Sequence, residues 1–269
     1  MTEMLLKIQH RTEYAYDGPV PYALQQVRMT PQSSAGQSVL SWETSVEGGR
    51  QEAAYIDQHN NHVELFSFDP ECRNVSIICK GEVNTADTTG IVGPHRGYAP
   101  LWYFKRTTPH TKAGPHIRGL LKTLGSDFDR DTDRLHALSA LIISTVAYET
   151  GKTGFETLAE QALEAGHGVC QDHAHIFISA ARLMGFPARY VSGYLMMDER
   201  TEQEAGHAWA EAHIDGLGWV GFDVSNGISP DERYVRVATG LDYDEAAPVS
   251  GITFGDQAET MIVTLQVQQ

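Results

Sequence analysis

The sequence of 269 residues has few cysteines, few basic residues and no long apolar segment. Its cysteines, Cys72, Cys79 and Cys170, are too few, and odd in number, for a disulfide framework. No run reaches the roughly 18 apolar residues that a membrane-spanning helix needs. The apolar stretch Met4-Leu5-Leu6 is too short for a signal peptide. We therefore expect a soluble, cytoplasmic protein without a membrane partner.

The scarcity of basic residues excludes a further class of partner. Lysine and arginine total 20 against 35 acidic residues, which gives a net charge of −15. Nucleic acid is not expected as a partner, because nothing in this balance offsets phosphate repulsion. Hydrophobic residues at 41% and charged residues at 20% are typical of a globular protein with a sizeable core.

The N-terminal part of the chain has the pattern of β-strands. From Leu6 to Tyr16 apolar and polar residues alternate, as expected for a half-buried strand. Further strands are predicted at 24–30, 39–46, 53–57, 63–69 and 75–83. Several short strands at close spacing predict a small all-β module, a sandwich or a barrel. We assign residues 1–95 to this domain.

Residues 86–115 are rich in glycine and proline and predict a long connection to a second domain at 96–269. Helices are predicted after it: one capped by Asp131 or Thr132, one with a Thr157–Glu160 capping box, and one from about Cys170 to Met184. Strands follow at 189–197, 207–214, 219–224, 234–238 and 261–267. Helices followed by strands indicate an α+β fold, with helices packed on an antiparallel sheet.

Cys170 differs from the other two cysteines in its surroundings. It lies in the first turn of a predicted helix, where free backbone N–H groups and the helix dipole favour a thiolate. Glycines at 166 and 168 would let a substrate approach. The pattern equally fits a buried structural cysteine, the role expected for Cys72 and Cys79. A catalytic thiol also needs a base and a group that orients the base.

Candidates for these two roles lie on consecutive strands. In residues 207–213, His207, Trp209, Glu211 and His213 share one face of a strand and three alanines share the other. The alanine face can pack on a helix, which leaves His207 at the strand start near the cysteine. Asp223 ends the next strand and could accept the imidazole N–H. Taken singly, such a histidine is more often a packing residue, and Asp223 a turn residue.

The pairing of these strands gives a geometric test. A two-residue loop at Gly216-Leu217 would place Asp223 opposite Ala210, on the face away from His207. His207 and Asp223 share a face only if the loop has an odd number of residues or a bulge restores the parity. We therefore expect a loop of about three or five residues, or a bulge.

Together these segments resemble the bacterial transglutaminase-like proteins. The resemblance is carried by Gly168-Val169-Cys170-Gln171-Asp172, Ala188 to Tyr194, His207-Ala208-Trp209, and Gly218-Trp219 with Phe222-Asp223. The first 85 residues or so resemble the β-rich domain that often precedes this core. The resemblance implies a papain-like core and the catalytic triad Cys170, His207 and Asp223. It also implies attack on an amide or ester carbonyl through a thioester.

The family includes transamidases, proteases, amidases and members without catalysis. We favour hydrolysis of a peptide, peptide-like amide or isopeptide bond, because nothing here marks the amine site of a protein cross-linker. A transamidase and a non-catalytic binding module are the alternatives. The Cys170 N–H is expected in the oxyanion hole, with Tyr148, Gln171 or His167 as second donor. No cofactor or metal is expected, because His173 and His175 diverge on their helix and no metal motif is present.

Overall fold

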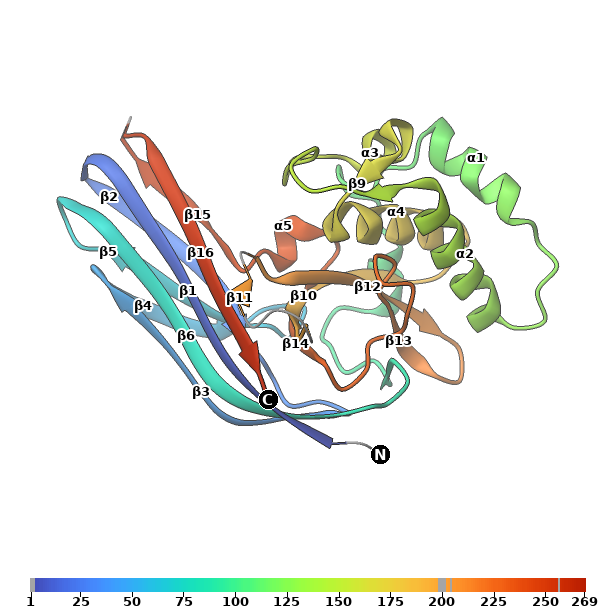
Figure 1. The fold of residues 1–269 in the computed structure, drawn as a ribbon, viewed down its shortest axis with the longest axis horizontal. Coiled ribbons are helices and arrows are strands. Elements are labelled where there is room, and N and C mark those ends of the chain that lie inside the picture. The colour runs from blue at the N-terminus through green and yellow to red at the C-terminus, as the bar shows by residue number, and fades with distance from the viewer. Residues whose placement is uncertain (1–2, 198–201, 204, 256) are drawn as a thin grey trace.

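The chain folds into two modules packed side by side, a β-sandwich and a helix-covered sheet (Figure 1). The computed structural model describes all residues except 1–2, 198–201, 204 and 256. The sandwich contains β1 (Glu3–Val20), β2 (Tyr22–Thr30), β3 (Gln37–Glu47), β4 (Gly49–Ile56), β5 (His62–Phe68) and β6 (Cys72–Ala86). The strands predicted for this region are confirmed.

The sandwich also contains the end of the chain. β15 (Val249–Phe254) pairs with β2, and β16 (Glu259–Gln268) pairs with β1 along ten residues. The two sheets have the orders β11-β16-β1-β6-β3 and β15-β2-β5-β4, where β11 is Glu202–Gln203. The assignment of all of 96–269 to the second domain was therefore wrong at its C-terminal end. Alternation predicted the strand at 261–267 but carries no information on its partner.

The second module is an antiparallel sheet under a layer of helices, which confirms the α+β class. Its strand order is β14-β10-β12-β13-β7. The strands are β7 (Ile91–Gly93), β10 (Ala188–Leu195), β12 (His207–Ile214), β13 (Gly218–Phe222) and β14 (Tyr234–Gly240). The helices are α1 (Pro115–Leu124), α2 (Asp131–Thr145), α3 (Ala159–Ala165), α4 (Cys170–Leu183) and the short α5 (Tyr243–Ala246). Two-residue strands β8 (Ala147–Tyr148) and β9 (His167–Gly168) pair in parallel.

Helix α4 lies at the centre of this module. Every residue of α4 from 172 to 182 is buried. The reason is that α1, α2 and α3 pack around α4 while the alanines of β12 pack against it. The side chain of Arg182 compensates for its burial by donating to the carbonyl oxygens of Phe104, Ala188 and Leu241.

Two predicted helix starts were wrong in detail. Helix α2 begins at Asp131 itself, preceded by Arg130, with no side-chain cap. Helix α3 begins at Ala159, where the Gln161 side chain accepts from the backbone N–H of Leu158. Glu160 instead accepts N–H groups at the start of α1, from Gly114 at 2.9 Å among others. The local pattern predicted that Glu160 caps its own helix, α3, whereas the tertiary structure places its carboxylate at the start of α1.

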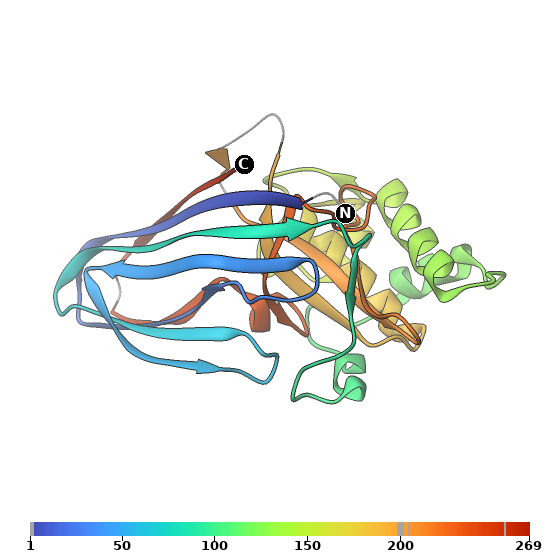
Figure 2. The ribbon, with the colours of Figure 1, turned by 90° about the horizontal axis from the view of Figure 1, so that it is seen from below.

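The two modules are joined by an apolar interface and by buried amides. Leu6, Ile8 and Leu265 of the sandwich pack with residues of β10 and β14. Asn61 receives the N–H of Thr239 and donates to its carbonyl, as a neighbouring strand would. The connecting segment includes β7 and a 3₁₀ turn, η1 (Leu101–Lys105), and Figure 2 shows it running beneath the second module. Phe104 of η1 is buried against Trp219.

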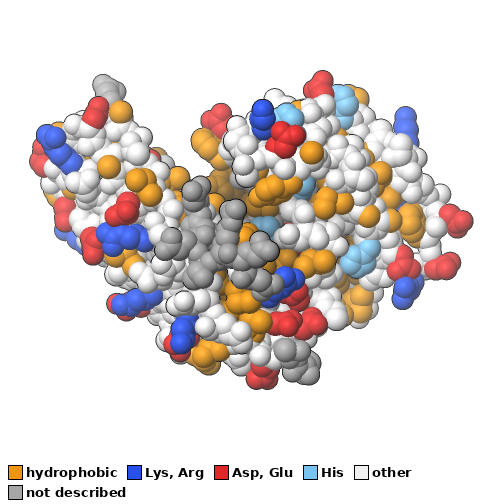
Figure 3. All heavy atoms as spheres, viewed as in Figure 1, with side chains coloured by type: hydrophobic (Ala, Val, Ile, Leu, Met, Phe, Trp, Pro, Cys, Tyr) orange, Lys and Arg blue, Asp and Glu red, His pale blue; other side chains and the backbone are white. Residues whose placement is uncertain are grey.

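The surface agrees with an acidic protein whose charges are dispersed. On the face shown in Figure 3, acidic and basic side chains lie interspersed over both modules. Among the described residues, no helix is both long and apolar enough to cross a membrane.

Candidate active site

Cys170 is the first residue of α4, as predicted. Helix α3 ends at Gly166, whose φ of 72° is in the left-handed region, and the chain then turns into α4. Asp172 caps α4 by accepting the N–H of Val169 at 2.8 Å. The backbone N–H of Cys170 is one of the groups that a helix leaves without an intrahelical partner. The thiol is only partly buried, whereas burial raises the pKa of Cys79 to about 12.

The hairpin that carries His207 and Asp223 has the predicted parity. Ala210 pairs with Phe222 and Ile214 with Gly218, so the loop is the three-residue segment Asp215-Gly216-Leu217. His207 and Asp223 therefore share a face of the sheet. The Nε2 atom of His207 lies 2.6 Å from Oδ2 of Asp223. The odd loop predicted from the sequence is confirmed.

Asp223 is fully buried and receives several hydrogen bonds on its carboxylate. The Tyr234 hydroxyl and the Asn226 side-chain amide each donate to Oδ2 at 2.7 Å, the oxygen that also faces His207. Burial alone would raise the pKa of Asp223, but the hydrogen bond and charge of His207, followed by the hydrogen bonds from Asn226 and Tyr234, lower it overall. Sequence reasoning missed both donors. Asn226 lies three residues after Asp223, outside any predicted strand, and Tyr234 lies in a predicted strand with no motif.

His207 is held in one orientation with one ring nitrogen left over. Burial would lower its pKa, but the interactions with Asp223 and Cys170 outweigh burial and raise the pKa to about 10. Because Nε2 faces Asp223, Nδ1 is the nitrogen available to the Cys170 sulfur. The ring of His207 packs against those of Trp209 and Tyr234.

The cysteine and histidine line a cleft of about 400 Å³ between the two modules. The second module contributes Gln171, Tyr190, Gly193, Tyr194 and Tyr243 among others. The sandwich supplies the opposite wall, formed by His10, Thr12, Tyr14, Arg28, Met29, Met261 and Val263. This wall contacts the second module at His10, whose Nδ1 lies 3.1 Å from the hydroxyl of Tyr194 in β10. Residues of both modules therefore line the cleft at Cys170.

Comparison with known protein families finds a matching family for each of the two modules. Residues 121–224 match the transglutaminase-like superfamily, and residues 6–84 match the bacterial transglutaminase-like N-terminal region. The chain belongs to the transglutaminase-like superfamily. Both parts of the resemblance seen in the sequence are confirmed.

Full-length relatives of this transglutaminase-like chain occur in mycobacteria. "Uncharacterized protein ML0607" of Mycobacterium leprae is 26% identical over 97% of this chain and 98% of its own. "Uncharacterized protein Rv2569c" of Mycobacterium tuberculosis is 26% identical over 95% and 90%. A solved structure from Cytophaga hutchinsonii, named "Putative Cysteine Protease", covers 100% of this chain and 92% of that chain, with a TM-score of 0.79 and 21% identity. The last comparison shows a shared fold.

Three residues, Tyr148, Gln171 and His167, were considered as the second oxyanion donor, and they differ in exposure and in hydrogen bonding. The Tyr148 side chain is half exposed, and burial together with the charges of Cys170 and Asp223 raises its pKa to about 12. The hydroxyl thus keeps its proton and can donate. Gln171 already donates its amide to the Phe155 carbonyl at 3.0 Å. His167 has a buried Nδ1 atom without a hydrogen-bond partner in the described chain.

The histidines of α4 have separate structural contacts. The ring of His173 lies between the Ser225 hydroxyl at 2.9 Å and the Val146 carbonyl at 3.1 Å. His175 is fully buried, and its Nε2 accepts the backbone N–H of Tyr243. These contacts make His175 a packing residue of the core.

Proposed function

We propose that this protein is a thiol-dependent hydrolase of amide, peptide or isopeptide bonds, with Cys170, His207 and Asp223 as its triad. The main support is the 2.6 Å contact between His207 Nε2 and Asp223, which leaves Nδ1 free for the interaction of His207 with Cys170. This is the order of groups that an activated thiol requires: nucleophile, base and orienting carboxylate.

The first half-reaction forms a thioester. Nδ1 of His207 takes the proton of the Cys170 thiol, and the sulfur attacks the substrate carbonyl carbon. The C–S bond forms while the carbonyl electron pair moves onto oxygen. The imidazolium, stabilised by Asp223, then gives its Nδ1 proton to the amide nitrogen as the C–N bond breaks. The amine leaves and an acyl-enzyme remains.

The second half-reaction uses water and the same histidine. Nδ1 takes a proton from water, whose oxygen attacks the thioester carbonyl. The C–S bond breaks, the acid leaves, and the sulfur regains its proton from the imidazolium. The Cys170 N–H and the Tyr148 hydroxyl are the donors that we assign to the developing oxyanion. Tyr148 is preferred because the amide of Gln171 is already engaged by Phe155.

A peptide library read by mass spectrometry tests the proposal. Incubation with and without a primary amine separates cleavage, deamidation and amine incorporation by mass. We expect cleavage or deamidation that does not need the amine. Amine incorporation as the dominant product would replace hydrolysis by transamidation, and no product from any peptide would favour a binding module.

The nucleophile is tested by substitution at matched cysteines. Cys170→Ala should lower turnover by at least about 10⁴-fold without loss of the fold, because no other group can form the thioester. Cys72 is also a partly buried cysteine, and the Cys72→Ala protein should keep wild-type turnover. Wild-type rates in the Cys170→Ala protein would exclude Cys170 as nucleophile. Iodoacetamide should modify Cys170 much faster than Cys72 or Cys79.

A further inference from the structure

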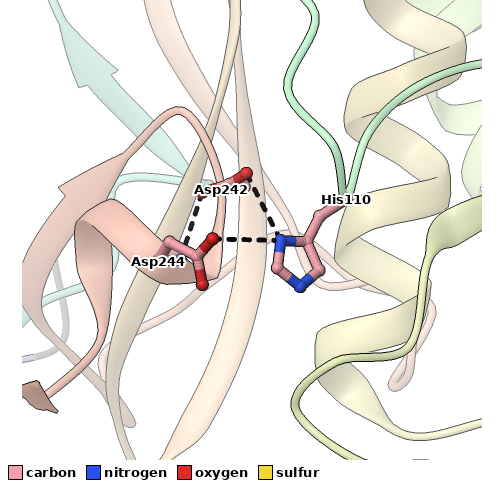
Figure 4. A group of neighbouring side chains, drawn as sticks. All are labelled: His110, Asp242 and Asp244. Carbon is pink, nitrogen blue, oxygen red and sulfur yellow. Dashed lines mark hydrogen bonds and ion pairs between the residues drawn. The ribbon is translucent and has the colours of Figure 1, made fainter.

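A second cluster of ionisable side chains lies outside the triad, where the connecting segment meets α5. It consists of His110, Asp242 and Asp244, shown in Figure 4. One ligand atom from each residue lies within 4.8 Å of the other two. His110 and Asp242 are buried, and Asp244 is exposed to solvent. The proposed hydrolase mechanism uses none of these residues.

The hydrogen bonding of His110 leaves one ring nitrogen without a partner. Nε2 lies 3.1 Å from the Phe155 carbonyl oxygen, which can only accept, so Nε2 carries the proton. The other nitrogen, Nδ1, is buried and has no hydrogen-bond partner among the described residues. Figure 4 shows Nδ1 directed at both carboxylates. Histidines that bind metals commonly donate their second N–H to a carbonyl in this way.

The distances fit a shared cation better than a shared proton. Nδ1 lies 3.5 Å from an oxygen of Asp242 and 3.4 Å from an oxygen of Asp244. A charge-assisted hydrogen bond to a carboxylate would be about 2.7–2.9 Å, and a single N–H can point at only one of the two. Zinc bonds of about 2.0–2.1 Å in tetrahedral geometry place neighbouring ligand atoms about 3.3–3.4 Å apart.

The local charges also favour a bound cation. Asp242 and Asp244 bring two carboxylates to the same side of the His110 ring. The positive charge of Arg182 interacts electrostatically with Asp242 from a distance. The guanidinium N–H groups of Arg182 donate to carbonyl oxygens and to the Thr111 hydroxyl. Without a bound cation, the lone pair of His110 Nδ1 would face one carboxylate oxygen of Asp242 at 3.5 Å and one of Asp244 at 3.4 Å.

We propose that His110, Asp242 and Asp244 bind a divalent transition-metal ion, with Zn²⁺ as the preferred ion. One imidazole and two carboxylates form a three-ligand set, and the exposed side of Asp244 leaves the fourth position open to water. The ion would tie the connecting segment at His110 to the start of α5. It would thereby fix Tyr243, which lines the substrate cleft. This site does not depend on the proposed hydrolase activity.

Zinc binding to the purified full-length chain tests the site. Isothermal titration with Zn²⁺ is done in the Cys170→Ala protein, because the thiolate and His207 could bind zinc themselves. We expect saturable 1:1 binding and a higher thermal unfolding midpoint, since a ligand that binds only the folded state stabilises it. Removal of zinc with a chelator should reverse the rise.

Two matched substitutions locate the ion. Asp244→Asn should weaken binding at least about tenfold, and this exposed position leaves the fold intact. His110→Ala should abolish binding. The control is Asp133→Asn, an exposed acid of α2 that pairs with Arg130. Equal zinc affinity in the Asp244→Asn and Asp133→Asn proteins would overturn the proposal. Absence of saturable binding to the folded parent would also overturn it and leave His110 as the protonated partner of an ion pair.

Discussion

The carboxylate of Asp223 combines three hydrogen bonds on one oxygen. His207, Tyr234 and Asn226 all face Oδ2. Tyr234 and Asn226 hold the carboxylate in place independently of the histidine. Preorganisation of this kind avoids reorganisation during the reaction.

Asp223→Asn should therefore remove the charge and keep the position. The amide oxygen can still accept from Tyr234 and Asn226, but it stabilises an imidazolium less. We expect kcat to fall by up to about 10⁴-fold, the cost of the same change in a serine protease triad. Steady-state kinetics measures the effect, with Asp133→Asn as control. An unchanged rate would reduce Asp223 to a turn residue.

At the scale of elements, the β12–β13 hairpin decides whether the triad can form. Its three-residue loop requires a positive φ of 83° at both Gly216 and Gly218. A Cβ at Gly218 would lie 2.2 Å from the Gly93 carbonyl oxygen of β7, whereas a Cβ at Gly216 would meet nothing within 4 Å. The two glycines thus share a conformation and differ in their neighbours.

Gly216→Ala and Gly218→Ala separate backbone strain from collision. Gly216→Ala should cost about 1–2 kcal/mol, from the left-handed conformation alone. Gly218→Ala should cost a further ~1–3 kcal/mol, because β7 must move, and should lower turnover as β13 shifts. Urea unfolding and kinetics of both variants check this. Equal losses would mean that β7 moves away freely.

At the scale of the whole molecule, the sandwich forms one wall of the cleft. Met261 and Val263 of β16 line the cleft, but Ile262 between them does not. This alternation follows from the two faces of a strand. Under the proposed function, this wall would contact a substrate bound at Cys170.

Met261→Ala tests the wall, with Ile262→Ala as its control. The two side chains are equally exposed, at 56%, and lie on opposite faces of β16. We expect Met261→Ala to raise KM about threefold to tenfold with little change in kcat, because a half-exposed methionine contributes roughly 1 kcal/mol of uniform binding. Ile262→Ala should leave KM unchanged. Equal effects would place the substrate elsewhere.

The interface between the modules should be sensitive to acid. Burial lowers the pKa of His10 from 6.5 to about 4. As the pH falls through 6.5, His10 takes up a proton in the unfolded chain before it does so in the folded chain. The contribution of neutral His10 to the free energy of unfolding is therefore fully present above pH 6.5 and declines towards pH 4. The loss from His10 is at most about 3 kcal/mol.

Thermal unfolding between pH 7 and pH 4 measures this dependence. His10→Gln should flatten part of it, because glutamine fills the interface without taking up a proton. The remaining slope includes buried His175, whose pKa burial also lowers. His116→Gln, at an exposed position on α1, serves as control. The same slope in the His10→Gln protein would contradict the assignment.

The sequence by itself determined the local pieces of this protein. Alternation located β1 and β12, glycines at 166 and 185 ended α3 and α4, and the resemblance to transglutaminase-like proteins grouped Cys170, His207 and Asp223. Parity also predicted that the loop between β12 and β13 has an odd number of residues or a bulge. Apart from the resemblance, each of these inferences depends on residues within one element or one hairpin, where backbone geometry fixes which side chains can meet.

Tertiary structure decided which distant segments become partners. The return of β16 to β1 pairs Tyr16 with Glu259, and β-strand periodicity does not encode that choice. The burial of α4 on every side, the donation of Tyr234 to Asp223 and the cleft wall at Met261 arise in the same way. They depend on contacts between segments far apart in the chain, which form only when both modules bury their apolar faces against each other.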